Sequence, residues 1–423
     1  MMFGAFGSAA FGLPSSLVAL LAVLPTSSLA WSIRATAPAK NLGTVLAENT
    51  NLTTYLSLVK AYPDILLQLP SDDGVTLVAP NNAAFSKYQN WDPNNKELVT
   101  SLLQYHILQG VVLTASVPKG ASNFATTLLK DPKWTNVTTG QQIVFDKQPD
   151  DLVVFTSGLG TRSTVVESDI PFTGGLVQVV ETIMVPPARL EPTARDAYKD
   201  LQSFLGALYL TGLVREFAES PNVTIFAPRD IAFQRVAGAL TALSKEELTT
   251  IMRYHIVSGQ VLPSKSFSNT SSLATSSGKL KITRSGNNLY FDRAQLLQPD
   301  ILLANGALHI IDGVLNPNNT AAAPDPALGT QTPAYPQTGA TATGTAVAHP
   351  FTSALPCTVD CPVPTATDGS GGGGGGSGAA ATSGTGAGSK ASKGGAAAGP
   401  RCTGMAAAVM VGVAGMGLVG GIV

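Results

Sequence analysis

The stretch VTIFAPRDIAF at residues 223–233 has a near copy earlier in the chain, VTLVAPNNAAF at residues 75–85. Each copy is typical of a strand that runs through a proline turn into a helix. The two copies share Val, Thr, Ala, Pro, Ala and Phe at the same places, so we infer that a whole domain is duplicated.

The similarity between the copies continues on both sides of this stretch. Before it, apolar side chains recur at the i, i+3, i+4, i+7 spacing of an amphipathic helix. After it come NNKELVTSLLQYHIL at residues 94–108 and LSKEELTTIMRYHIV at residues 243–257. These predict helices that start at capping boxes and end near a Tyr-His pair. The predicted capping boxes are Asn94 with Glu97 and Ser244 with Glu247, and the apolar positions before the stretch are Leu52, Tyr55, Leu56 and Val59, and Leu201, Phe204, Leu205 and Leu208.

The C-terminal ends of the two copies are also similar. ESDIPFTGGLVQVVETIMVP at residues 167–186 aligns without a gap to QPDILLANGALHIIDGVLNP at residues 298–317. Alternation of Leu308 and Ile310 with His309 predicts a half-buried strand. The offset between the copies is 149 at the histidines and 131 at the aspartates, so copy one carries about 18 extra residues in its middle. We expect them to form a longer hairpin there.

Composition separates these copies from the C-terminal part of the chain. Residues 318–394 are dominated by Ala, Thr, Pro, Ser and Gly, which cannot bury enough apolar surface to fold, and they are predicted to form a disordered stalk. The whole chain has 26 basic and 27 acidic residues and no basic run, which argues against nucleic acid as a partner.

Both ends of the chain carry the pattern of a processing signal. Residues 1–30 contain an eight-residue apolar run and end in a small-x-small cleavage pattern, which predicts a signal peptide. Residues 395–423 end in an apolar tail that no basic residue follows, and small residues and a short spacer come before the tail. This layout predicts attachment of a glycolipid at Gly394, with Gly395, Ser392 and Ser389 as alternatives, and placement on the outer face of the plasma membrane or in the cell wall.

Cysteines and sequons fit passage through the secretory pathway. Cys357 and Cys361 lie in the stalk, where a secreted chain is expected to oxidise them to a local disulfide. The two copies themselves contain no cysteine, so core packing must hold them together. Five acceptor sequons predict N-glycosylation: Asn51, Asn136, Asn222, Asn269 and Asn318.

A helix, VTxxAPxxxAF, a Tyr-His pair and a closing GxxHxIDxVLxP strand, in this order and twice, resemble the fasciclin domain. The resemblance covers residues 41–187 and 190–317 and implies an α+β fold, with two tandem wedge-like β-sandwiches, each with helices packed around one end. Copy one departs from the closing pattern, because Gln178 and Glu181 stand where copy two has His309 and Asp312. The resemblance implies adhesion and matrix interaction.

The resemblance also suggests site residues. In animal relatives an Asp-Ile pair and the Tyr-His region are linked to integrin binding, and the matching pairs here are candidate adhesion residues. A structural role competes with this interpretation, because an Asp can begin a turn and an Ile can pack beneath it. We expect the histidines to be buried and hydrogen-bonded to backbone through one ring nitrogen, since each lies on an apolar helix stripe. The pairs are Asp169-Ile170 and Asp300-Ile301, and Tyr105-His106 and Tyr254-His255.

Catalytic, metal and cofactor motifs are lacking in the sequence. There is no GxSxG, phosphate loop or HExxH, so no cofactor and no enzyme activity are predicted. The leading hypothesis is a cell-surface glycoprotein that binds a surface or matrix protein or a wall polysaccharide. The alternatives are a purely structural wall glycoprotein, a carbohydrate-active enzyme, and a vacuolar membrane protein with a retained C-terminal helix.

Overall fold

The duplicated stretch forms the same strand and helix twice. In copy one, β1 (Val75–Pro80) leads into α3 (Asn82–Lys87). In copy two, β8 (Val223–Pro228) leads into α8 (Asp230–Arg235). All six residues of both strands are buried. The prediction of a duplicated domain is therefore confirmed, and the copies are called domain 1 and domain 2 below.

The computed structural model describes residues 40–69, 74–89, 91–267, 272–320, 323–337 and 349–356. All of them belong to one unit that spans residues 1–359. The expected signal peptide, Asn269, the pair Cys357 and Cys361, and the anchor site at Gly394 lie outside the described residues.

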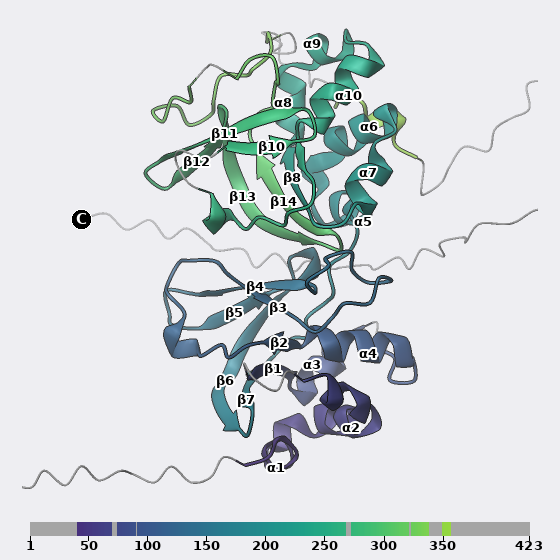
Figure 1. The fold of residues 1–423 in the computed structure, drawn as a ribbon, viewed down its shortest axis with the longest axis vertical. Coiled ribbons are helices and arrows are strands. Elements are labelled where there is room, and N and C mark those ends of the chain that lie inside the picture. The colour runs from purple at the N-terminus through teal and green to yellow at the C-terminus, as the bar shows by residue number, and fades with distance from the viewer. Residues whose placement is uncertain are drawn as a thin grey trace, which may run out of the picture. The chain divides into compact units, whose positions relative to one another are not determined.

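Each domain is built on a seven-stranded sheet with the same strand order (Figure 1). In domain 1 the order is β2-β1-β7-β6-β5-β4-β3, and in domain 2 it is β9-β8-β14-β13-β12-β11-β10. The remaining strands of domain 1 are β2 (Ile107–Gln109), β3 (Asn123–Thr126), β4 (Gln142–Lys147), β5 (Val153–Thr156), β6 (Arg162–Phe172) and β7 (Gly175–Val180). Those of domain 2 are β9 (Ile256–Val257), β10 (Ser272–Thr275), β11 (Gly278–Ser285), β12 (Asn288–Phe291), β13 (Ala294–Leu303) and β14 (Gly306–Ile311).

The closing strand of each domain pairs in parallel with the strand of the duplicated stretch. This central position buries all six residues of β14, including His309, so the prediction of a half-buried strand is wrong. The strand is covered on both faces, as parallel central strands usually are. At the start of β14, a Cβ on Gly306 would lie 1.9 Å from the carbonyl oxygen of Val223, so the close approach of the two backbones requires glycine.

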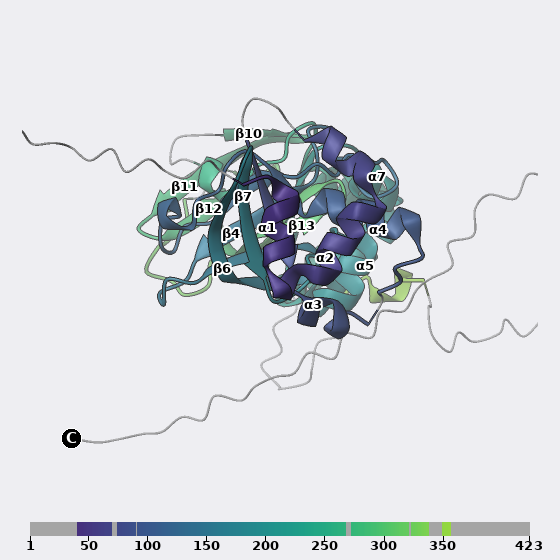
Figure 2. The same ribbon diagram turned by 90° about the horizontal axis from the view of Figure 1, so that it is seen from below.

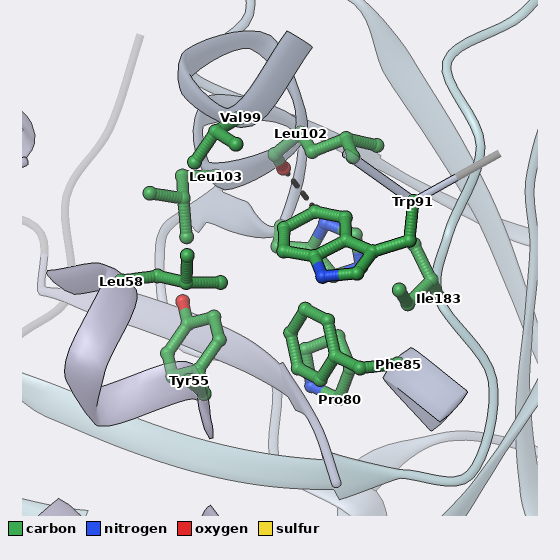
Figure 3. A pocket seen from close by; sticks show the side chains of 10 residues that line it. Tyr55, Leu58, Pro80, Phe85, Trp91, Val99, Leu102, Leu103 and Ile183 are labelled. Atoms are coloured by element: carbon green, nitrogen blue, oxygen red, sulfur yellow. Dashed lines mark hydrogen bonds between the residues drawn. The ribbon is translucent and has the colours of Figure 1, made fainter. Parts of the chain in front are cut away.

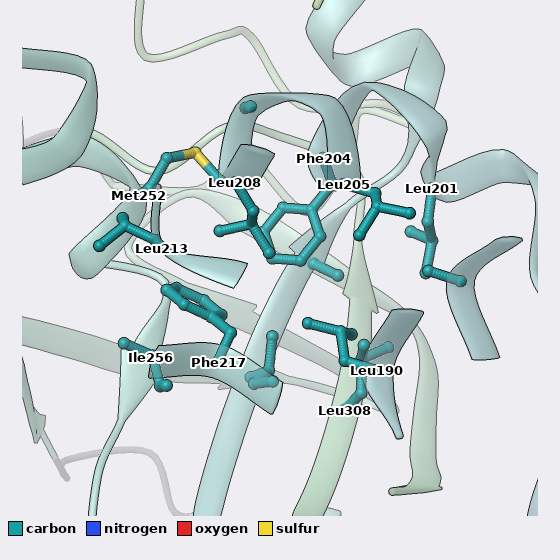
Figure 4. Packing of buried hydrophobic residues seen from close by; sticks show 14 of the residues in the cluster. Leu190, Leu201, Phe204, Leu205, Leu208, Leu213, Phe217, Met252, Ile256 and Leu308 are labelled. Carbon is teal, nitrogen blue, oxygen red and sulfur yellow. The ribbon is translucent and has the colours of Figure 1, made fainter. Parts of the chain in front are cut away.

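Helices cover one side of each sheet, and in Figure 2 α1 lies next to β6 and β7, with α2 and α4 on its far side. In domain 2, Phe204, Leu208 and Phe217 pack with Met252 against Leu308 of the sheet (Figure 4). The α+β class is thus confirmed. The helices are α1 (Leu42–Glu48), α2 (Thr53–Ala61), α4 (Lys96–Tyr105), α5 (Leu190–Pro192), α6 (Gln202–Thr211), α7 (Val214–Glu219), α9 (Ala237–Thr241) and α10 (Lys245–Arg253), with short 3-10 turns η1 (Thr50–Leu52), η2 (Pro63–Gln68), η3 (Thr114–Ser116), η4 (Gly158–Gly160), η6 (Lys199–Leu201), η7 (Ser264–Ser266) and η8 (Thr352–Ala354) and the π-turn η5 (Thr193–Ala197).

The predicted capping boxes fare differently in the two domains. In domain 2 the side chains and backbones of Ser244 and Glu247 bond reciprocally, as predicted. In domain 1 the helix starts one residue later than predicted, because the side chain of Asn95, not Asn94, accepts the backbone N–H of Leu98. Either asparagine can cap a helix, so the sequence alone did not decide between them.

The extra residues of domain 1 lie chiefly between β3 and β4. Residues 127–141 join these strands, whereas residues 276–277 suffice between β10 and β11. The longer connection reaches domain 2 at the β13–β14 hairpin. There the Thr135 hydroxyl and the Asn136 backbone N–H donate to the carbonyl of Ala304, at 3.0 and 2.8 Å, and the buried Gln141 amide donates to that of Leu303 at 3.1 Å. The insertion is therefore hydrogen-bonded to domain 2.

Two stretches of the expected stalk contact domain 2. Tyr335 and Phe351 pack against the domain 2 core, and the Gln331 backbone N–H donates to Asp312 at 3.1 Å. The prediction that residues 318–394 form a disordered stalk is therefore wrong for residues 323–337 and 349–356. Isolated aromatic side chains in a polar, small-residue segment supply the burial that its average composition does not indicate.

Candidate functional site

The histidine of each Tyr-His pair ties a helix end to the last turn of its domain. In domain 2, the Nδ1–H of His255 donates to the carbonyl of Ile251 at 2.8 Å, and the Nε2 accepts the backbone N–H of Leu315 at 3.0 Å. The ring is fully buried. We predicted a bond through one ring nitrogen, and the structure shows that both nitrogens are used. Because Nδ1 donates and Nε2 accepts, the ring must be neutral.

His106 makes the same two bonds in domain 1, to the carbonyl of Leu102 at 2.7 Å and from the N–H of Met184 at 2.9 Å. Burial lowers the pKa of His106 to about 4, against a smaller opposing effect of the Leu102 bond, and His255 behaves alike. His106 lines a cavity of about 10 Å³, and Figure 3 shows Tyr55, Phe85 and Trp91 around this cavity. A cavity so small and apolar does not accommodate a ligand.

The tyrosines of the two pairs are buried as well. The Tyr105 hydroxyl donates to the carbonyl of Gln142 at 3.1 Å. That of Tyr254 lies 2.7 Å from the carbonyl of Lys279 and 2.9 Å from the carboxylate of Asp292. Burial raises the pKa of both tyrosines well above the usual range. Each Tyr-His pair therefore fastens a helix end both to the sheet and to the segment that follows the closing strand.

Each Asp-Ile pair lies at a bulge in the longest strand of its domain. The pairing register shifts between Glu167 and Ile170 in β6 and between Gln298 and Ile301 in β13. In both bulges the aspartate has a positive φ, 57° for Asp169 and 63° for Asp300. An L-residue other than Asn or Asp is rarely found in this left-handed region, which explains the choice of residue.

The two carboxylates hold the first residue of a 3-10 turn. The Asp300 carboxylate accepts the backbone N–H of Ser264 at 2.8 Å and the Ser264 hydroxyl at 2.5 Å. Asp169 accepts the same two groups from Thr114. Partial burial raises the pKa of Asp169, but the hydrogen bonds from Thr114 and Gln178 outweigh it, so that the pKa lies below the usual range.

A different residue type supports the bulge in each domain. It stands at the histidine position of the closing GxxHxIDxVLxP pattern, where domain 1 has Gln178 and domain 2 has His309. Gln178 Oε1 accepts the backbone N–H of Asp169 at 2.8 Å, and its Nε2 donates to the carbonyl of Val112 at 2.9 Å. His309 accepts from Asp300 through Nδ1 at 3.2 Å and donates from Nε2 to the carbonyl of Leu262 at 3.0 Å. Burial lowers the pKa of His309 against the opposing charge of Asp300, so the ring is neutral and the pair is not an ion pair.

The members of the Asp-Ile pairs differ in exposure. Asp300 is 7% exposed and Ile301 is 4% exposed, and Ile301 belongs to the domain 2 core. Asp169 and Ile170 are half-buried, with Ile170 packed against the domain 1 core. Both isoleucines therefore support the fold, and Asp169 is the more accessible of the two carboxylates.

An open groove lies beside Asp169 on domain 1. It has a volume of about 180 Å³, and its lining includes Thr114, Leu152 and Val166. Leu152 and Val166 are 45% and 50% exposed. Thr114, which Asp169 holds, thus lines a groove in which these two exposed aliphatic side chains lie beside the polar Asp151 and Ser168.

The described sequons fall into two groups. Asn51 and Asn318 are exposed. Asn136 and Asn222 are half-buried and bonded between the domains: the Asn136 amide donates to the carbonyl of Glu219 at 2.8 Å, and Asn222 accepts the N–H of Thr138 at 3.0 Å.

Within the described part of the chain, no cluster of three or more His, Cys, Asp or Glu residues could hold a metal ion. None of the described helices is both long and apolar enough to span a bilayer.

Comparison with known proteins identifies the domains. The model of the fasciclin domain family matches residues 50–186 and 199–317. The chain belongs to the fasciclin domain family. A fasciclin-like arabinogalactan protein of Arthroderma benhamiae is 29% identical over 305 residues, which cover 70% of this chain and 71% of the relative. One from Phaeosphaeria nodorum is 29% identical over 283 residues, which cover 66% of this chain and 88% of the relative.

Among solved structures, a FAS1 domain pair from the insect cell adhesion molecule fasciclin I aligns with 65% of this chain and all of that one. The TM-score is 0.32 and the sequence identity is 16%. The prediction of tandem fasciclin domains is confirmed by the family match. The sequence did not reveal Thr114 and Ser264 as partners of the aspartates, since they lie 55 and 36 residues away along the chain. Their shared place, eight residues after His106 and nine residues after His255, was the available signal.

Proposed function

We propose that this protein is a non-enzymatic cell-surface glycoprotein whose fasciclin domains mediate contact with another cell, the extracellular matrix or the cell wall. Its family and the names of its fungal relatives support this proposal. The observation that carries it is the open groove of domain 1, which exposes Leu152 and Val166. Exposed apolar side chains that line one groove are typical of an interaction surface.

The two domains differ at this surface. Leu297 is the counterpart of Val166 and is 40% exposed. Leu152, however, lies in the five-residue β4–β5 connection, and only two residues connect β11 and β12. Domain 2 therefore has no counterpart of Leu152 in that turn, and we assign the contact surface to domain 1.

The candidate adhesion residues take different roles in this proposal. Asp169 acts as a positioning residue, because it fixes Thr114 at the rim of the groove. Asp300, Ile301 and Ile170 support the fold, since their side chains are buried or packed against the cores. Tandem domains on a tether suit weak multivalent binding, where linkage increases avidity without new contacts.

Delivery to the surface is part of the same proposal. Residues 1–30 would direct secretion, and a glycolipid at Gly394 would anchor the chain, with N-glycans at the exposed Asn51 and Asn318. Phosphatidylinositol-specific phospholipase should then release the protein from intact cells. Protein that remains on the cells with an intact C-terminal peptide in mass spectrometry would contradict the lipid anchor.

The adhesion test uses the double variant Leu152→Asp, Val166→Asp. Cells that display it should bind neighbouring cells or wall material less than cells that display wild type, because two charges in the groove disfavour apolar contact. Both side chains are exposed, so the melting temperature should not change. The matched control is Leu297→Asp in domain 2, which should leave adhesion intact. Unchanged adhesion of the double variant would refute the groove as the contact surface.

The role of Asp169 is tested with Asp169→Asn, which keeps the shape and removes the charge. A positioning role predicts weaker adhesion together with a slightly lower melting temperature, because the bonds from Thr114 weaken. Loss of adhesion at unchanged melting temperature would instead show that the carboxylate itself contacts the partner. Asp300→Asn is the matched control and should change stability only.

A further inference from the structure

Residues 349–356 pack on the helical side of domain 2, far along the chain from the end of its sheet. Phe351 and Leu355 join the domain 2 core, and η8 (Thr352–Ala354) lies against α6 (Figure 1, yellow-green beside α6). The ring of Phe351 meets that of Phe233 in α8 edge to face, with centroids 6.2 Å apart. An aromatic pair of this geometry is a specific contact.

The backbone of this segment touches α6 at Gly206. A Cβ on Gly206 would lie 2.3 Å from the carbonyl oxygen of Phe351 and 2.7 Å from its carbonyl carbon. These are backbone atoms, which cannot move aside as a flexible side chain can. Gly206 is thus required by the docked segment, although glycine is a poor helix former.

A buried carboxylate adds a polar contact. Asp230 is 3% exposed and accepts the backbone N–H of Ser203 at 2.7 Å. Its second oxygen lies 3.3 Å from Nδ1 of His349. A buried carboxylate is costly unless donors surround it, so His349 adds a partner for Asp230 beside the one that Ser203 provides.

Domain 1 shows the same face without these features. Its counterpart of Gly206 is Ser57, which is exposed, and its counterpart of Asp230 is the uncharged Asn82, which is half-buried. Asn82 still accepts the backbone N–H of Thr54 at 2.9 Å, just as Asp230 accepts that of Ser203. The helix contact is therefore common to both domains, while the glycine and the charge are found only where the segment docks.

We propose that the face formed by Gly206, Asp230 and Phe233 is a peptide-binding site, and that its ligand is residues 349–356 of the same chain. The ligand carries an imidazole that meets Asp230 and, two residues later, an aromatic ring that meets Phe233, and its backbone lies on Gly206. The last described residues, 349–356, therefore lie on the helices of domain 2 and not at the end of β14. The 11 residues 338–348, which link the two described stretches, can span at most about 36–40 Å.

The first test is hydrogen–deuterium exchange of the full chain with Gly206→Ala. In wild type, the hydrogen-bonded amides of Ala354 and Leu355 should be protected. In the variant, residues 349–356 should exchange like an unstructured peptide, while α6 stays protected because alanine favours the helix. The matched control is Ser57→Ala in domain 1, which should leave the segment protected. Protection of residues 349–356 that is equal in wild type and in Gly206→Ala would overturn the proposal.

The second test supplies the ligand separately. A fluorescent synthetic peptide of residues 349–356 should bind the full-length variant Phe351→Ala, whose own segment has lost its anchor. Binding to wild type should be at least about tenfold weaker, because the tethered segment competes at a high effective concentration. The double variant Gly206→Ala, Phe351→Ala should not bind it. If the peptide does not bind Phe351→Ala, the proposed site is refuted. If residues 349–356 of wild type are protected from exchange only when the protein is dimeric, the assignment of the ligand to the same chain is refuted.

Discussion

Replacement of His255 by alanine tests the structural role of the Tyr-His pairs most directly. The change leaves a cavity where the fully buried ring was, and it leaves the Leu315 N–H and the Ile251 carbonyl without the imidazole. A cavity of this size and an unpaired buried N–H together cost about 2–4 kcal/mol of unfolding free energy. Urea denaturation at pH 7, followed by far-UV circular dichroism, measures this cost.

Acid should reduce the difference between wild type and His255→Ala. Burial lowers the pKa of folded His255 from 6.5 to about 4, so between these values the unfolded chain binds a proton that the folded chain does not. The stability that the neutral ring provides is complete above pH 6.5 and is lost as the pH falls toward 4. The loss approaches about 3 kcal/mol for this histidine. The penalty of His255→Ala should therefore be largest at pH 7 and small at pH 4.5.

His106→Ala provides the matched case in domain 1, where the fluorescence of Trp91 and Trp134 can report unfolding. It should show the same pH-dependent penalty, because its ring makes the same two bonds and has the same lowered pKa. A penalty for either variant that is constant between pH 7 and pH 4.5 would refute the neutral, buried histidine. Loss of adhesion with unchanged stability would refute the structural role altogether.

Two further substitutions test single contacts. Tyr55→Phe should raise the unfolding free energy by about 1 kcal/mol, since its buried hydroxyl has no hydrogen-bond partner among the described residues and domain 2 has Phe204 at that position. Tyr105→Phe, which loses a bond to Gln142, should lower the unfolding free energy, and a lower value for Tyr55→Phe would show that its hydroxyl has a partner. Gln141→Leu should lower the melting temperature by a few degrees, because it loses the bond to Leu303, which is worth about 1–2 kcal/mol. The control Gln104→Leu breaks an exposed bond to Gln68 and should leave the melting temperature unchanged, so equal effects of the two variants would exclude a stabilising role for the interdomain contact.

The duplication made most of the fold predictable from sequence. Two copies of one pattern provide two independent observations of each element, and the strand of VTIFAPRDIAF, the helix before it and the Tyr-His helix all lie where the pattern places them. Less was predictable at β14, where alternation suggested an exposed face. Its central position is set by pairing with β8, more than 80 residues away, and local periodicity does not contain that information.

Contacts of the insertion and the stalk were unpredictable for a related reason. Length differences identified the extra residues of domain 1, but not that Thr135 and Gln141 would bond to the β13–β14 hairpin of domain 2. Average composition indicated a disordered segment after Pro317, and averages do not register one aromatic side chain such as Phe351. A short segment docks only where other parts of the chain form a matching surface, here the face of Gly206, Asp230 and Phe233. The composition of the segment itself contains no information about that surface.

The difference between Gln178 and His309 shows which hydrogen bonds the closing strand must provide. Sequence comparison of the two copies treats them as a mismatch, yet each accepts the N–H of the bulged aspartate and donates to a loop carbonyl. A neutral imidazole and a carboxamide both place one acceptor and one donor on the same side chain, as this position requires. The aspartates themselves are less replaceable, because they combine a positive φ with a carboxylate that binds two groups of one residue. At the closing strand, therefore, any side chain with one acceptor and one donor can occupy the position of Gln178 and His309. At the bulge, the positive φ restricts the choice of residue further, so both domains have aspartate there.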